Sequence, residues 1–203
     1  MPTTSPFEVD DSPQARILRS ARREIERSGI LGLRVADVAR GAHSSVTLIY
    51  RYFGDRDGLL AAVLGQLYDE IQDNLITWLE AFAADDTPLR REDLTKVIVV
   101  PSKEQMEMSW KIRLQILAVS SVNPVLREHL ERTTRATYAR SKAAVKRINS
   151  RMVDGHRFDE RIFNVMAINQ LFYYTDLMGA DGPTAGDYLG YVSDLLEFLP
   201  PTT

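Results

Sequence analysis

The residues best suited to binding chemistry lie on a short predicted helix from Val46 to Phe53. Ile49 and Phe53, spaced i, i+4, form an apolar face that can pack against the rest of the protein. On the opposite face, a guanidinium could bind guanine or phosphate, and a threonine methyl could contact the methyl group of thymine. We therefore expect that face to bind DNA; it carries Val46, Thr47, Tyr50 and Arg51.

Enzymatic chemistry is not expected. The three histidines, His43, His129 and His156, have no metal-ligand or catalytic-triad partner at a diagnostic spacing. The chain has no cysteine, which leaves no disulfide framework, no thiolate zinc site and no cysteine nucleophile. We expect no cofactor and no metal, with His43 in a turn and the other two histidines on the surface.

A second short helix would precede the one that carries the binding face. Val35, Val38 and Ala39 form one apolar stripe at i, i+3, i+4 spacing. The pattern breaks at His43, a residue type that is enriched at the positive φ of turns. Ser45 is a preferred N-cap for the next helix. The two helices and their turn form a helix-turn-helix.

The helix before this motif completes a predicted three-helix head, and a long helix follows the head. The first begins at the Ser12–Pro13 pair, an N-cap followed by proline at the first helical position, and ends near Ser28–Gly29. The other begins at Arg56, with Asp55 as its cap, and carries apolar residues at steps of three and four through Phe82. At ~1.5 Å per residue, this helix would span roughly 40 Å.

The rest of the chain is also predicted to be helical, and no strand pattern appears. We expect an all-α fold of about nine helices, with a DNA-binding domain in residues 1–58 and a helical body in residues 59–203. The expected limits of the helices in the body are Val100, Ser102, Asn123–Pro124, Asp154–Gly155, Asp159, Gly182–Thr184 and Pro200.

Charge and hydropathy favour a cytoplasmic protein whose basic end faces DNA. No apolar run is long enough to span a bilayer, and the first residues lack the features of a signal peptide. The net charge is -3, but residues 12–60 hold nine arginines against five acids. Local charge governs counterion release at phosphates, so this asymmetry supports DNA binding by the head.

The segment from Val38 to Leu60 resembles the helix-turn-helix of the tetracycline-repressor (TetR) family of bacterial transcription regulators. His43 replaces the usual glycine, Val46-Thr47 replaces a common Lys-Gly pair, and Arg56 replaces the usual lysine. The resemblance is carried by Val38, Ala39, Ala42, Ser45, Ile49, Tyr50, Tyr52, Phe53, Arg56, Leu59 and Leu60.

The resemblance implies a role for each residue of the binding face. Thr47 and Arg51 would face base edges, and Val46 would touch a thymine methyl. The residues that would hold phosphates are Ser45, Tyr50, Tyr52 and Arg56. Tyr50 and Tyr52 could instead be aromatic residues that pack against the rest of the head, and this alternative is stronger for Tyr52 than for Tyr50.

Two other cationic features have more than one interpretation. Arg34 begins a helix, where a cation opposes the helix dipole, so a DNA phosphate nearby would satisfy it; the alternative is a solvated arginine. A basic run on the long helix after Pro124 suggests either a second nucleic-acid patch or a solvated helix face, and we favour the latter. This run comprises Arg140, Lys142, Lys146, Arg147 and Arg151.

The family resemblance also implies a body that binds a small molecule and dimerises. We expect a ligand-responsive regulator, a repressor of a near-palindromic operator, released by a small apolar or aromatic molecule. The homodimer would form through the last two helices, whose broad apolar surface could otherwise be plain core. The alternative function is a helical ligand-binding or protein-interaction dimer whose head no longer reads specific DNA. Candidate ligand-lining residues, which could equally be core, are Met106, Trp110, Leu114, Tyr138, Asn169, Phe172 and Tyr173.

Overall fold

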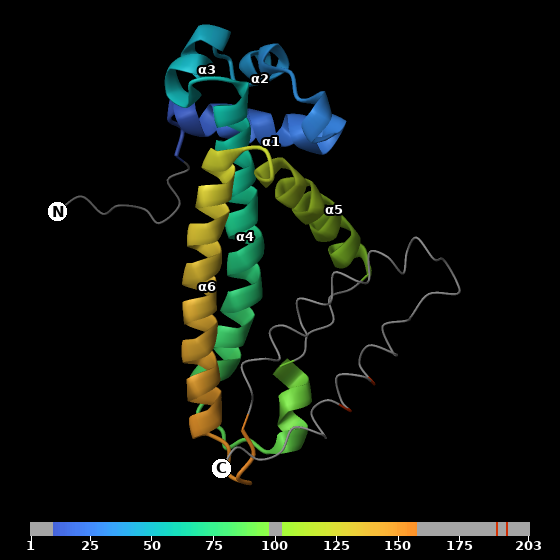
Figure 1. Ribbon diagram of the computed structural model, residues 1–203, viewed down its shortest axis with the longest axis vertical. Helices are drawn as coiled ribbons and strands as arrows, with labels where there is room; N and C mark the ends of the chain where they lie inside the picture. The colour runs from blue at the N-terminus through green and yellow to red at the C-terminus, as the bar shows by residue number, and fades with distance from the viewer. Residues whose placement is uncertain (1–9, 98–102, 158–189, 191–193, 195–203) are drawn as a thin grey trace, which may run out of the picture. The chain divides into compact units, whose positions relative to one another are not determined.

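The computed structural model describes residues 10–97, 103–157, 190 and 194, and over these residues it is helical (Figure 1). The all-α class is therefore confirmed, although the described residues form six α-helices and one 3-10 helix instead of about nine helices. The two helices expected to begin at Asp159 and Thr184 lie outside the described residues. The elements are α1 Pro13–Gly32, α2 Val35–Gly41, α3 Val46–Phe53, α4 Arg56–Ala84, η1 Arg91–Val97, α5 Lys103–Ser120 and α6 Pro124–Ser150.

The chain divides into two compact units, which share α4, α5 and α6. Unit 1 comprises the residues up to Asp69 together with Gln115–Glu131, and unit 2 comprises Glu70–Leu114 and the residues from Arg132 onward. No helix in the described part of the chain is both long and apolar enough to cross a membrane.

The first helix of unit 1 begins where the sequence predicts and breaks near its predicted end. Ser12 Oγ accepts a hydrogen bond from the Ala15 backbone N–H at 3.2 Å, which caps α1. Gly29 adopts φ 71° and ψ 171°, a conformation that interrupts the helix. One further turn follows the break and extends α1 to Gly32, beyond the predicted end.

The helix-turn-helix packs on α1 through a small apolar core. Ile17, Val38 and Ile49, one from each helix, are fully buried. His43 has φ 49°, which confirms a turn residue in the left-handed region, and Ser45 Oγ caps α3 by accepting from the Leu48 N–H at 3.1 Å. This core fixes which face of α3 can turn outward.

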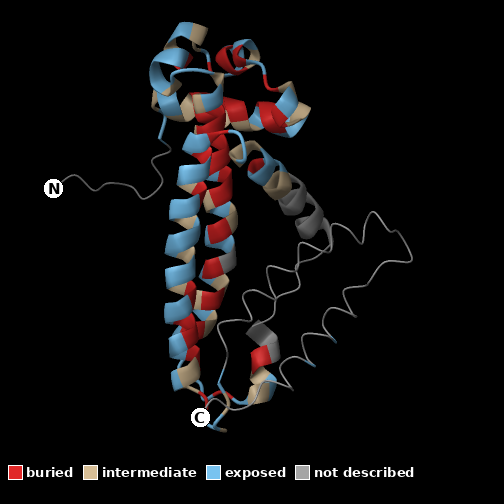
Figure 2. Cartoon of the chain, viewed as in Figure 1, coloured by how far each residue is buried: buried red, intermediate tan, exposed pale blue. Residues whose placement is uncertain are grey.

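The long helix α4 begins at a tight turn after α3. Asp55 Oδ1 accepts from the Gly58 N–H at 2.8 Å, which confirms the predicted cap. A Cβ atom on Gly58 would collide with the Phe53 carbonyl, so the turn requires glycine at this position. Buried residues continue along α4, as the red stripe in Figure 2 shows.

Unit 2 has its own apolar core between the later turns of α4 and α6. The rings of Trp78 and Phe82, which pack against this core, stack with their centroids 6.0 Å apart. The buried residues of this core are Ile76, Leu79, Ala83, Leu89, Leu94, Ala144, Val145, Ile148 and Met152.

Two arginines of the predicted basic run bind within unit 2, Arg140 on α6 and Arg151 directly after it. Arg140 donates to both carboxylate oxygens of Glu80 at 2.8 Å and to Asp73 at 2.6 Å. The hydrogen bond from Arg140 lowers the pKa of the Glu80 carboxyl. The side chain of Arg151 is only 8 % exposed and donates to the Phe82 carbonyl at 2.6 Å. Arg140 and Arg151 are therefore engaged within the chain, and the other three members of the run, Lys142, Lys146 and Arg147, are exposed.

Candidate nucleic-acid interface

The third helix presents its predicted binding face outward. Ile49 is 0 % exposed and anchors the helix, whereas Tyr50 is 42 % exposed. Thr47 and Arg51 are exposed beside Tyr50, and Val46 is half-buried at the start of the helix. A short helix with a buried back and an accessible front of this composition can enter a DNA groove.

The predicted phosphate contacts Ser45 and Tyr52 are also exposed. Ser45 Oγ already accepts a hydrogen bond from the Leu48 N–H, and its hydroxyl hydrogen can still donate to a phosphate oxygen. Tyr52 is 43 % exposed and its ring lies 6.2 Å from that of Phe53, centroid to centroid. Tyr52 therefore packs against Phe53 and is still accessible from solvent.

Two arginines of the head, Arg34 and Arg51, have side chains that form no hydrogen bond or ion pair with another described residue. The other seven in residues 12–60 are engaged within the chain. Five of them pair with carboxylates, Arg23 donates to the Gly41 carbonyl, and Arg56 contacts both backbone carbonyls and Asp57. A guanidinium with no internal partner can bind an external anion without breaking an existing pair. The engaged arginines are Arg16, Arg19, Arg22, Arg23, Arg27, Arg40 and Arg56.

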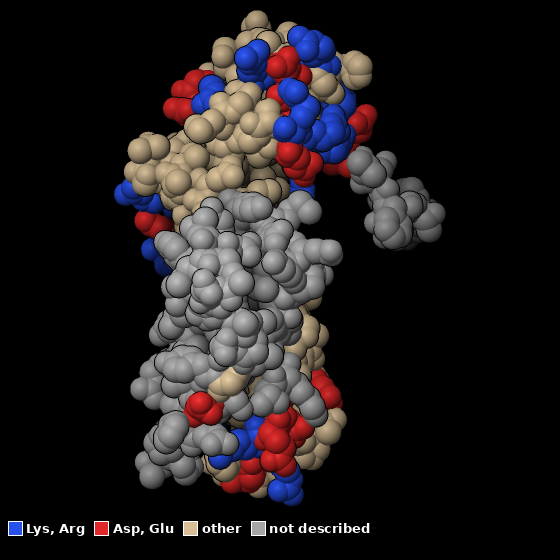
Figure 3. Space-filling model, turned by 90° about the vertical axis from the view of Figure 1, so that its right-hand side faces the viewer, with Lys and Arg blue, Asp and Glu red and all other residues tan. Residues whose placement is uncertain are grey.

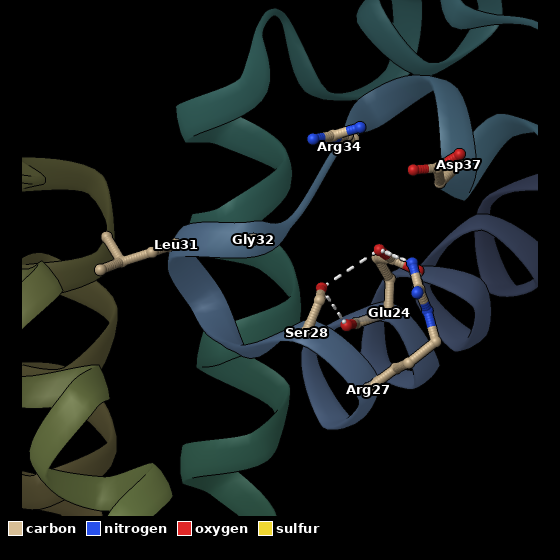
Figure 4. Close-up of a pocket in the computed structure, with 7 residues that line it drawn as sticks. All are labelled: Glu24, Arg27, Ser28, Leu31, Gly32, Arg34 and Asp37. Atoms are coloured by element: carbon tan, nitrogen blue, oxygen red, sulfur yellow. Dashed lines mark hydrogen bonds and ion pairs between the residues drawn. The ribbon is translucent and has the colours of Figure 1, made fainter.

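Arg34 lies beside a pocket of about 400 Å³ in unit 1 (Figure 4). Within that pocket Arg27 and Ser28 both donate to Glu24, and Asp37 is paired with Arg40 outside it. No such contact reaches Arg34, which is exposed at the N-cap of α2. The acids of the pocket are thus already neutralised, which leaves the charge of Arg34 uncompensated.

Arg56 differs from the other predicted contacts because it binds the chain's own backbone. Its Nε donates to the Leu33 carbonyl and its Nη2 to the Ile30 carbonyl, each at 3.4 Å. A weaker ion pair joins Nη1 to Asp57 Oδ1 at 3.9 Å. The side chain is 42 % exposed, so solvent reaches it as well.

Charged side chains of both signs lie on the surface of unit 1. On the face of unit 1 seen in Figure 3, basic and acidic side chains are interspersed and do not form an extended basic field.

Two residues of unit 1, Asn123 and His129, have contacts that the sequence analysis did not identify. Asn123 Nδ2 donates to the Asp57 carbonyl at 3.0 Å, and its Oδ1 accepts from the Leu126 N–H, which caps α6. His129, expected on the surface, is half-buried with Nε2 2.9 Å from Asp69 Oδ2. An asparagine directly before Pro124 is a cap signal, but nothing local indicates its partner on α4.

The described residues contain little of the predicted ligand cavity. Leu114 is half-buried, and Tyr138 is 46 % exposed with Lys142 Nζ 4.9 Å from its ring centroid. Tyr138 therefore lies on an accessible part of α6 with a cation over its ring. The other candidates fall outside the described side chains; they are Met106, Trp110, Asn169, Phe172 and Tyr173.

The family model that matches this chain covers the helix-turn-helix. Residues 17–63 match the model of the family described as bacterial regulatory proteins, tetR family. This stretch includes α2, α3 and the first turns of α4, so it contains every residue of the predicted DNA-binding face.

Relatives among curated proteins match part of the chain. The chain is 28% identical over 129 residues to the HTH-type transcriptional regulator BetI of Burkholderia thailandensis, a match that covers 62% of this chain and 64% of the relative. A shorter match to BetI of Burkholderia cenocepacia is 37% identical over 51 residues, 25% of this chain and 26% of that protein. The chain thus matches less than two thirds of the length of these relatives.

Solved structures extend the likeness of the fold to most of the chain. A protein from Rhodococcus sp. described as a TetR-family transcriptional regulator superposes with a TM-score of 0.59 at 21% identity, over 93% of this chain and 98% of that one. A transcriptional regulator from Saccharomonospora viridis, in complex with choline, gives a TM-score of 0.59 at 20% identity over 91% and 95%.

Proposed function

We propose that the chain is a ligand-responsive transcriptional repressor of the TetR family, whose model matches residues 17–63, and that it binds a near-palindromic operator in the cytoplasm. The observation that carries this proposal is the outward face of α3. There Thr47, Tyr50 and Arg51 are exposed opposite the buried Ile49, and no partner for Arg51 is recorded in the described part of the chain.

In this proposal α3 enters the major groove with its N-terminus leading. Arg51 binds guanine O6 and N7 with two donors, and Thr47 contacts a neighbouring base edge. Val46 packs on a thymine methyl. Phosphate contacts, which position the head without specifying sequence, come from Arg34, Ser45, Tyr50 and Tyr52.

A homodimer would present two such faces. One head makes few contacts, so two heads on one DNA duplex are needed for tight binding. The two half-sites would lie about 34 Å apart or slightly more, so that both α3 helices reach successive major grooves. The proposed interface is a four-helix arrangement of the last two helices with their symmetry mates, supported by the apolar pattern of residues 159–199.

Residues 59–203 would form the body that binds the effector. A ligand that prefers the dimer arrangement unable to bind DNA would shift a two-state equilibrium and release the operator. The proposed ligand is a small apolar or aromatic molecule. Choline belongs among the test compounds because one structural neighbour holds it, and aromatic side chains such as Trp110 and Tyr138 can bind a quaternary ammonium.

The experiment that tests the proposal is selection of bound duplexes from random DNA, followed by titration of the selected site. Arg51→Ala should lose most of the selectivity between this site and unrelated DNA. Arg22→Ala is the matched control, since Arg22 is half exposed but paired with Glu26 at 3.1 Å. If Arg51→Ala binds as tightly and as selectively as the wild-type chain, the assignment of α3 is wrong.

The same selection separates the alternative function from the proposed one. A head that no longer reads specific DNA would enrich no sequence and would bind all duplexes alike, with an affinity that falls with salt. Enrichment of a palindrome would exclude that alternative. His43 gives the alternative no support, because it occupies the turn at φ 49° while α2 and α3 keep their packing.

A further inference from the structure

The end of α1 is a place where backbone carbonyls need partners. The last carbonyls of any helix have no donor within the helix. In α1 the break at Gly29 leaves a single short turn, closed by a long hydrogen bond of 3.4 Å from the Leu33 N–H to the Ile30 carbonyl. The side chains of Ile30 and Leu33 are 4 % and 3 % exposed, so this turn is packed into the head.

Arg56 supplies donors to both carbonyls from another helix. Its Nη2 contacts the carbonyl of Ile30 and its Nε that of Leu33, each at 3.4 Å. The flat guanidinium offers several donors in fixed directions, which lets one side chain bridge two acceptors three residues apart.

These contacts also explain why a cation can stand at the start of α4. As the first residue of α4 it lies at the positive end of that helix dipole, where a cation is unfavourable. Its guanidinium turns instead toward the backbone carbonyls of Ile30 and Leu33, whose partial negative charge favours a cation. The contact across the head thus compensates the disadvantage within α4.

We propose that Arg56 is a positioning residue that fixes the α3–α4 turn, and through it the recognition helix α3, against the end of α1. Arg56 lies three residues after the last residue of α3, so its tether limits how α3 can tilt. This inference rests on the proposed DNA-binding function. It gives Arg56 a different role from the phosphate contact that the family resemblance implies.

The test compares Arg56→Lys and Arg56→Gln with the wild-type chain on the selected operator over a range of salt concentrations. A lysine keeps the charge but offers one point donor, so it cannot bridge both carbonyls. Positioning by Arg56 predicts that Arg56→Lys binds about tenfold more weakly, the size expected for losing charge-assisted hydrogen bonds. The dependence of log K on log salt should keep its slope in both variants.

A phosphate contact predicts the opposite pattern. Arg56→Lys would then bind like the wild-type chain, and Arg56→Gln would reduce the salt slope by about 0.9, the value for one phosphate neutralised on duplex DNA. Either result overturns the inference. Arg34→Lys and Arg34→Gln are the matched controls and should show this second pattern, since no partner for Arg34 is recorded in the described part of the chain.

A measurement without DNA keeps the inference separable from the proposed function. Amide hydrogen exchange of residues 30–34 should be at least several-fold faster in Arg56→Lys than in the wild-type chain, because the last turn of α1 loses its tether. Unchanged exchange there overturns the inference even if the wild-type chain binds its operator. If the wild-type chain binds no specific DNA but Arg56→Lys still shows the faster exchange, the proposed function is wrong and the tether by Arg56 remains supported.

Discussion

The side-chain amide of Asn123 donates a hydrogen bond to the carbonyl oxygen of Asp57 at 3.0 Å, which joins the start of α6 to the first turn of α4. The same side chain caps α6 through its oxygen, at 3.0 Å from the Leu126 nitrogen. Asn123 is 8 % exposed; its contact with Leu126 is buried and its contact with Asp57 is partly buried. The side chain of Asn123 therefore caps α6 and also joins it to α4.

Substitution of Asn123 should separate these two contacts. Asn123→Ala loses both and should lower the free energy of unfolding by about 1–3 kcal/mol. Asn123→Ser keeps a good cap but is too short to reach Asp57, so it should lose only part of that stability. The measurement is urea unfolding of both variants. Wild-type stability in Asn123→Ser would show that the bond to Asp57 contributes nothing.

The α3–α4 turn should not tolerate a side chain at Gly58. An added Cβ would collide with the Phe53 carbonyl, which is backbone and cannot rotate away. Gly58→Ala should lower stability by about 1–3 kcal/mol and weaken operator binding, because α3 must shift. The control is Gly190→Ala, since nothing lies within 4 Å of a Cβ at Gly190. Equal effects of the two substitutions would contradict the close approach at the turn.

The pair between Glu80 and Arg140 should make the stability of unit 2 depend on pH. The hydrogen bond from Arg140 lowers the pKa of Glu80 below its ordinary value of 4.5, so the folded state favours the charged form. The stabilisation is therefore present above pH 4.5 and is lost as the pH falls through the lower folded-state pKa.

Thermal unfolding at pH 7 and pH 3 checks this dependence. Glu80→Gln should unfold at a lower temperature than the wild-type chain at pH 7, and the difference should shrink at pH 3. Because the Glu80 side chain is 40 % exposed, 1 M salt should also reduce the difference. A difference that is the same at both pH values would refute the proposed role of this carboxylate.

Dimerisation should depend on the apolar stripe of the last predicted helix. Leu195→Glu places a charge on that stripe and should raise the dissociation constant of the dimer by at least tenfold, as measured by sedimentation velocity. Operator binding should weaken with it, because a single head binds poorly. Gly190→Glu adds the same charge at an exposed position and should leave the dimer intact. A dimer unaffected by Leu195→Glu would place the interface elsewhere.

The elements of the head could be predicted from sequence because their signals are local. The caps formed by Ser12, Ser45 and Asp55 each bind an N–H three residues later, so short windows of sequence contain both partners. The buried position of Ile49 likewise follows from the period of a helix. Such patterns also indicated the outward face of α3.

Contacts between distant segments could not be predicted in this way. Arg56 binds carbonyls 23 and 26 residues earlier, and Asn123 binds one 66 residues earlier. The side chain of an arginine at a helix start suits a phosphate and a carbonyl equally well, so only the fold decides between them. The sequence predicts a surface position for His129 because its partner Asp69 lies 60 residues away.

The central claim, that α3 reads DNA through Arg51, is tested most directly by a double-mutant cycle on the selected operator. One arm is Arg51→Ala, and the other replaces the guanine of the half-site with 7-deazaguanine, which removes the N7 acceptor. Direct readout predicts that the two changes are not additive, with a coupling of about 1–3 kcal/mol. Strict additivity would show that Arg51 does not contact this guanine and would contradict the account.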